Sequence, residues 1–152
     1  MDRYKAAAIQ MTIEQGDKAK NVENALRWID LACAEGAKIV CLPEYFSTGY
    51  PGQGIGQVAE SIPGPTVESL AKEAAQKEIF VIAGSIVEKD GESFHNTSVL
   101  IDSSGKIIGK YRKTHPWRGS HKDEYGDGIV PGETYPVFYT ELGKRAVPLD
   151  SD

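Results

Sequence analysis

Cysteine is scarce in this sequence, since only Cys33 and Cys41 occur among its 152 residues. Two cysteines in apolar surroundings do not form a metal-binding framework, and in a reducing compartment we expect them to be thiols rather than a disulfide. Within residues 115–124, four residues carry groups that bind metals, but no two of them stand at rigid ligand spacing on one element, so we expect no metal site. These residues are His115, His121, Asp123 and Glu124.

The sequence also lacks a run of like charge and a long hydrophobic stretch. Its 17 basic and 22 acidic residues give a net charge of −5, and the lysines and arginines are scattered. This distribution argues against nucleic acid or an anionic membrane as a partner. The N-terminal MDRYKAAAIQM has only a short apolar stretch and resembles neither a signal peptide nor a membrane span. We therefore expect a cytoplasmic protein.

The hydrophobic residues change period along the chain, from that of a strand to that of a helix and back. With 40% hydrophobic residues, the chain has the length of one ordinary globular domain and can bury a core. The pattern predicts one helix capped by Asp17 and stopped at Gly36, a second beginning at Thr66, and an irregular loop over residues 47–57. Predicted strands cover residues 4–11, 39–42, 79–87, 93–101, 106–113, 136–139 and 145–149, the first two being buried.

This order of elements indicates an α/β protein with helices covering a sheet. In such sheets, ligands bind where strands end at their carboxyl edge. The stretch KIVCLPEYF places Glu44 at that edge, three residues after Cys41. We interpret Cys41, in a strand buried on both faces, and Cys33, on a helix face, as core residues, because a reactive thiol needs exposure and an electropositive setting. Glu44 taken alone is a solvated loop carboxylate, a helix-cap partner or a functional group.

A second segment, GKYRKTHPWRG, ends a predicted strand with Lys113. Lysines at strand ends are usually solvated, so Lys113 alone would be interpreted as structural. In the strand predicted over residues 93–101, we expect His95 and Asn96 to serve strand packing and backbone hydrogen bonds. Aromatic residues close to both segments either line a pocket or pack at turns; they are Phe46, Tyr50 and Trp117.

Taken together, four stretches resemble the nitrilase superfamily of carbon–nitrogen hydrolases. They are AAIQM, GAKIVCLPEYFSTGY, FHNTSVLIDSSGKIIGKYRKTHPW and PGETYPVFYTELGK, in the expected order over nearly the whole chain. The motifs PE and YRK are specific as a pair, with Glu44 and Lys113 separated by 69 residues. The resemblance implies a four-layer α-β-β-α sandwich, of which residues 1–152 form a single, incomplete domain corresponding to about the N-terminal half.

The resemblance also implies an activity, the cofactor-free hydrolysis of nonpeptide carbon–nitrogen bonds in small amides, carbamoyl compounds or nitriles, by a protein that forms homo-oligomers. Such enzymes use a cysteine nucleophile, a glutamate general base and a lysine that stabilises developing negative charge. Glu44 matches the base and Lys113 the lysine, and their pKa values are expected to be coupled. Glu124 is either the family's supporting second glutamate or a solvated loop residue. The YRKTHPW motif favours amides over nitriles.

The sequence departs from the family pattern where the nucleophile is expected. After TELGK it reads RAVPLDSD, which aligns Asp150 with the catalytic cysteine and Asp152 with the aspartate that follows it. A carboxylate cannot replace a thiolate as the nucleophile, so we expect no amide turnover from this chain as written. Two interpretations stay open: the N-terminal part of a truncated carbon–nitrogen hydrolase, or a noncatalytic binding or interaction module on the same scaffold.

Overall fold

Two long helices form where the hydrophobic period predicts them. The computed structural model describes residues 3–146, in which α1 spans Lys18–Ala34 and α3 spans Pro65–Lys77. The side chain of Asp17 caps α1 by accepting a hydrogen bond from the backbone N–H of Lys20 at 3.1 Å. Just beyond α1, Gly36 adopts a φ of 85°, a left-handed conformation that ends helices readily because glycine has no Cβ.

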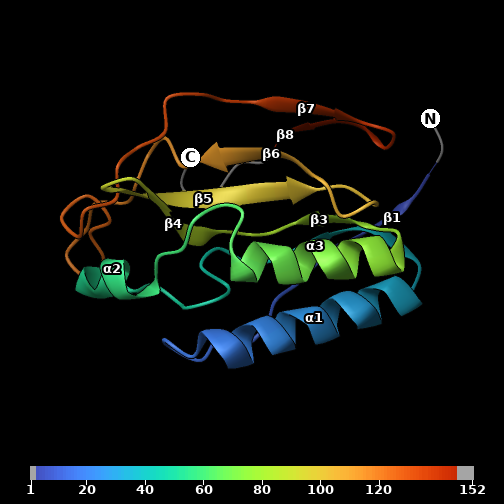
Figure 1. Cartoon of the computed structure of the whole chain (residues 1–152), viewed down its shortest axis with the longest axis horizontal. Helices are drawn as coiled ribbons and strands as arrows, with labels where there is room; N and C mark the ends of the chain where they lie inside the picture. The colour runs from blue at the N-terminus through green and yellow to red at the C-terminus, as the bar shows by residue number, and fades with distance from the viewer. Residues whose placement is uncertain (1–2, 147–152) are drawn as a thin grey trace.

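Both helices cover one face of a six-stranded mixed sheet (Figure 1). Strands β1, β2 and β3 pair in parallel, and β5 runs antiparallel to β3, β4 and β6. The strands are β1 (Lys5–Ala8), β2 (Ala37–Cys41), β3 (Phe80–Ile82), β4 (Ile86–Asp90), β5 (Ser93–Ile101) and β6 (Ile107–Arg112). The main core fills the space between helices and sheet, with Ile29, Leu70 and Val81 among its fully buried members.

A two-stranded hairpin lies over the opposite face of the sheet (Figure 1). It consists of β7 (Val137–Thr140) and β8 (Gly143–Ala146). Phe138 packs so closely on Gly109 of β6 that a Cβ there would lie 1.9 Å from the ring. Helices, sheet and hairpin therefore form successive layers, which confirms the predicted α/β class.

Three details differ from the predicted elements. The strand expected over residues 79–87 is divided into β3 and β4 at Gly84, whose φ is 43° and where a Cβ would lie 2.0 Å from the carbonyl oxygen of Pro43. The buried strand expected over residues 4–11 is the four-residue β1, which is mostly exposed because it lies at the edge of the sheet. The loop expected to be irregular contains two short helical segments, η1 (Gly52–Gly54) and α2 (Ile55–Val58).

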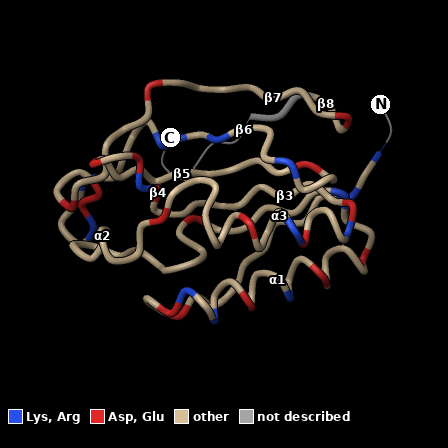
Figure 2. The backbone as a smooth tube through the Cα atoms, viewed as in Figure 1, with Lys and Arg blue, Asp and Glu red and all other residues tan. Residues whose placement is uncertain are grey.

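The C-terminal strand expected at residues 145–149 is described only in part. Residues 145 and 146 belong to β8, whereas 147–149 and Asp150 lie outside the described residues. Acidic and basic positions are interleaved along the helices and strands (Figure 2). Within residues 3–146, no helix is long and apolar enough to cross a membrane.

A buried carboxylate ties together the strands that carry the site. Glu88 of β4 is 1% exposed and accepts hydrogen bonds from Nε and Nη2 of Arg112, at 2.8 and 2.9 Å, and from the Lys110 ammonium. Thr97 of β5 donates a further bond at 2.7 Å. Burial alone would raise the pKa of Glu88, but these donors outweigh it and lower the pKa to about 2. Glu88 thus binds β4, β5 and β6 together while it remains charged.

Replacing Glu88 by glutamine should destabilise the fold by about 2 kcal/mol near pH 7, because the partly exposed Lys110 and Arg112 lose their buried anion. Folding lowers the pKa of Glu88, so its ionised carboxylate stabilises the protein at a pH above the pKa that it has in the unfolded chain. This stabilisation is lost as the pH falls toward the folded-state pKa of about 2. Urea unfolding of wild type and Glu88→Gln should therefore converge as the pH falls below about 4. The control Asp90→Asn removes a 59% exposed partner of Arg112 and should cost less than about 1 kcal/mol. If Glu88→Gln lowered the free energy of unfolding equally near pH 7 and below about pH 4, the stabilising role of the ionised Glu88 would be contradicted.

Candidate active site

Alternation along β6 sends neighbouring cations to opposite faces of the sheet. Lys110 and Arg112 point to the face on which Glu88 lies, whereas Gly109, Tyr111 and, by the same period of two, Lys113 point to the hairpin face. The Lys113 side chain is 3% exposed, and its Nζ lies 2.9 Å from Oε1 of Glu44. Glu44 follows β2 at the carboxyl edge of the parallel strands, so the two predicted residues meet across 69 positions of sequence.

Glu124 completes the cluster from the long loop after β6. Its side chain is 2% exposed, and Oε2 lies 3.1 Å from Nζ of Lys113. Four donors surround this carboxylate: the hydroxyl of Tyr45, Nδ2 of Asn96 at 2.8 Å, the backbone N–H of Trp117 at 2.5 Å, and Lys113. The solvated alternative for Glu124 is therefore wrong. Two donors at each of its carboxylate oxygens hold the side chain in this conformation.

The charges in this cluster sustain one another. Burial alone would lower the pKa of Lys113, but Glu44 and Glu124 outweigh it and raise that pKa above its ordinary value. Burial alone would raise the pKa of Glu124, but its hydrogen bonds and the charge of Lys113 lower it. The cluster is therefore a lysine ammonium between two carboxylates, with a net charge of −1 in this state.

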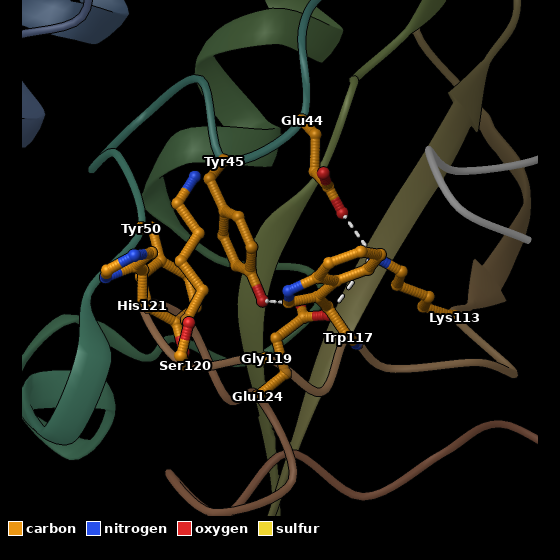
Figure 3. A pocket seen from close by; sticks show the side chains of 10 residues that line it. Glu44, Tyr45, Tyr50, Lys113, Trp117, Gly119, Ser120, His121 and Glu124 are labelled. Carbon is orange, nitrogen blue, oxygen red and sulfur yellow. Dashed lines mark hydrogen bonds and ion pairs between the residues drawn. The ribbon is translucent and has the colours of Figure 1, made fainter.

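Tyr45 owes its position to an unusual backbone. It has a φ of 51°, which is uncommon outside glycine, and its N–H donates to Oγ of Ser85 at 3.0 Å. This turn directs the ring of Tyr45 toward Glu124 (Figure 3). Burial first and the nearby Glu124 second raise the pKa of the Tyr45 hydroxyl, which keeps it protonated as a donor.

A cavity of about 510 Å³ opens beside the cluster (Figure 3). Glu44, Lys113 and Glu124 line it together with aromatic walls from Tyr45, Tyr50 and Trp117. Further lining residues are Gly119, Ser120, His121 and Lys122. The hydroxyl of Tyr50 donates to Asp127 at 2.5 Å and accepts a hydrogen bond from the N–H of Asp123 at 3.0 Å, so it joins the loop after β6 to the cavity wall.

Neither cysteine lines this cavity. Cys41 is partly buried in β2, where burial raises the pKa of its thiol, and Cys33 packs from α1 against the main core. Among residues 3–146, no cluster of three or more His, Cys, Asp or Glu side chains could hold a metal ion. Asp150 lies outside the described residues.

The sequence alone missed two members of the site. Asn96 was expected to serve packing, but its side chain donates to both Glu44 and Glu124. The sequence does contain a signal for this role, because Asn96 places an amide within a strand that is mostly buried. A buried polar group needs hydrogen-bond partners. Tyr45 was not singled out. Phe46, expected at the pocket or in packing, is fully buried in the main core.

Known proteins identify the family to which this arrangement belongs. A family model described as carbon–nitrogen hydrolase matches residues 5–148. The chain therefore belongs to the carbon–nitrogen hydrolases of the nitrilase superfamily. It is 33% identical over 144 residues to human omega-amidase NIT2, covering 92% of this chain and 52% of that protein. It is 36% identical over 152 residues to nitrilase homolog 2 of Dictyostelium discoideum, covering 92% and 45%.

Solved structures agree with these relatives. Nit3 of Saccharomyces cerevisiae, a nitrilase superfamily member, superposes with a TM-score of 0.77 at 30% identity and covers 90% of this chain and 51% of that one. An amidase from Nesterenkonia sp. superposes with a TM-score of 0.78 at 25% identity and covers 93% and 53%. The chain thus spans about half the length of the relatives it matches.

Replacing Lys113 by methionine should destabilise the protein by about 3 kcal/mol near pH 7, because the buried Glu124 and the partly buried Glu44 lose their shared cation. The raised pKa of Lys113 stabilises the fold below about pH 10, and the lowered pKa of Glu124 stabilises it above about pH 4. The difference in the free energy of unfolding between wild type and Lys113→Met should therefore be largest between about pH 4 and about pH 10 and become smaller on either side. Urea unfolding at a series of pH values measures it. Lys122→Met, at the exposed cavity rim, should change stability by less than about 0.5 kcal/mol. A pH-independent loss in Lys113→Met would argue against the ion cluster.

Proposed function

We propose that the cavity binds the amide group of a small molecule and that its residues form the acid–base part of a carbon–nitrogen hydrolase site. The observation that carries this proposal is the set of bonding positions left open. Oε2 of Glu44 accepts no hydrogen bond from the residues 3–146, and Lys113 uses two of its three donors on carboxylates. A primary amide offers the complement, an N–H for Glu44 and a carbonyl oxygen for Lys113.

In the proposed reaction, a thiolate attacks the amide carbon and ammonia leaves, after which water releases the acid. Glu44 would take the thiol proton, pass it to the leaving nitrogen and then deprotonate the water. Lys113 would stabilise the negative charge that develops on the amide oxygen. Glu124 would hold Lys113 in place, supported by its own four donors.

The thiol is the missing component. Because neither Cys33 nor Cys41 lines the cavity, we propose that the 152-residue chain binds amides without hydrolysing them. We further propose that it represents one incomplete domain, which is consistent with its coverage of about half of each relative. Complexes of the Nesterenkonia amidase with acrylamide and butyramide support the choice of small amides as ligands.

Butyramide should bind the purified chain with a Kd of about 1 mM, as expected for a small ligand, and release no ammonia above the blank. Butyrate should bind more weakly, since the cluster carries a net negative charge. Chemical-shift titration reads binding, and an ammonia assay reads turnover.

The matched variant Glu44→Gln keeps the size of the side chain and removes its charge. It should weaken butyramide binding about tenfold, because a hydrogen bond to a charged group is lost. Ammonia release that disappears on Glu44→Gln would refute the inactivity of this chain. Equal binding of butyramide by wild type and Glu44→Gln would refute the amide site.

A thiol placed at position 150 should be activated by the existing cluster, because alignment to the family pattern puts the nucleophile there. In Asp150→Cys, iodoacetamide should modify Cys at position 150 at least about tenfold faster than Cys33, as measured by peptide mass spectrometry. Adding Glu44→Gln should remove the advantage, whereas Lys122→Met should not. Modification at the same rate with and without Glu44 would show that the alignment of Asp150 is wrong.

A further inference from the structure

Asn96 closes a ring of hydrogen bonds in the site. The side chain is fully buried in β5, and its Nδ2 donates to Oε1 of Glu44 at 2.7 Å and to Oε1 of Glu124 at 2.8 Å. Lys113 contacts the same two carboxylates at 2.9 and 3.1 Å. The donors Lys113 and Asn96 therefore alternate with the acceptors Glu44 and Glu124 in a closed ring. Lys113 is the charged donor and Asn96 the neutral one.

The sheet fixes both donors of this ring. The backbone N–H of Lys113 donates to the carbonyl oxygen of Asn96 at 2.9 Å, which joins the two residues directly across β5 and the end of β6. Asn96 is also paired with Val87 of β4. The two carboxylates come from loops, whereas Asn96 lies in β5 and Lys113 directly follows β6, so donors joined to the sheet determine where the two loop carboxylates lie.

The ring makes the two carboxylates chemically different. Both oxygens of Glu124 are occupied by its four donors. In Glu44, Asn96 and Lys113 both bond to Oε1 and leave Oε2 without a partner among residues 3–146. Without Asn96, Glu44 would be held by Lys113 alone and could rotate either oxygen toward the cavity.

The Asn96 side chain also lowers the stability of the fold through its carbonyl oxygen. Its Oδ1 is buried and has no hydrogen-bond partner among the described residues, a situation that costs about 1–3 kcal/mol. Turning the amide over would place Oδ1 against two carboxylate oxygens, so the donor orientation is the favourable one. The side chain is therefore held by its Nδ2 group, which bonds to both carboxylates, and not by its Oδ1.

We propose that Asn96 is a positioning residue that holds the Glu44 and Glu124 carboxylates on either side of Lys113 and selects Oε2 of Glu44 as the reactive oxygen. This role rests on the proposed function of Glu44 as a base. The ring itself can be tested without any ligand, so a failure of amide binding and a failure of the ring are distinguishable.

The first measurement uses the wild-type chain and the side-chain NH2 resonances of Asn96, assigned by their loss in Asn96→Asp. Both protons should be shifted downfield and protected from solvent exchange, because each is bonded to a carboxylate. Both should also move when Glu124 titrates. Two exposed, equivalent protons that exchange freely would overturn the proposal.

The second measurement follows the carboxyl carbons of Glu44 and Glu124 in Asn96→Ala, with assignments from Glu44→Gln and Glu124→Gln. Loss of a donor should raise the pKa of Glu124 and tighten its proton binding about tenfold, and it should shift the Glu44 carboxyl resonance. The matched control is Ser98→Ala, since Ser98 is buried two positions along the same strand and its Oγ has no partner among the described residues. A Glu124 titration unchanged in Asn96→Ala, or changed equally in Ser98→Ala, would overturn the proposal. If Asn96→Ala does not fold, the wild-type measurement decides.

Discussion

A lysine ammonium buried between two carboxylates is the constraint on which the site depends. Removing Lys113 from water is unfavourable unless anions and hydrogen bonds replace its hydration, and Glu44 and Glu124 do so at 2.9 and 3.1 Å. The carboxylates in turn need donors, which Tyr45, Asn96 and the Trp117 N–H provide. Each group is stable in its charged or polar form only because the others are present.

The motif YRK serves two structures at once. Its arginine points to one face of the sheet and bonds to Glu88, while its lysine points to the other and bonds to Glu44. The first ion pair joins β4 to β6 and therefore fixes the backbone that carries Lys113. Arg112 in the stabilising network and Lys113 in the candidate site are thus adjacent in sequence, yet their side chains do not meet. Successive side chains of a strand point to opposite faces of the sheet.

The sequence predicted the parts of the site that local motifs mark. Glu44 in PE and Lys113 in YRK could be predicted from spacing and family resemblance, and the α/β class followed from the alternating periods. The bonds that Asn96 and Tyr45 make to Glu124 could not be predicted, because Glu124 lies 28 and 79 residues away from them along the chain. The burial of β1 was misjudged for a similar reason: an alanine-rich stretch reads as buried, whereas its exposure depends on which strands flank it.

In the proposed reaction, the two carboxylates around Lys113 would have different roles. Whenever Glu44 takes up a proton in the proposed reaction, Lys113 loses the negative charge of its partner at 2.9 Å. A buried lysine with no anion would tend to release its own proton and could no longer stabilise an oxyanion. Glu124 prevents this, because its four donors keep it ionised and it stays next to Lys113 throughout. In the proposed reaction, Glu44 would therefore be able to exchange protons because Glu124 stays ionised beside Lys113.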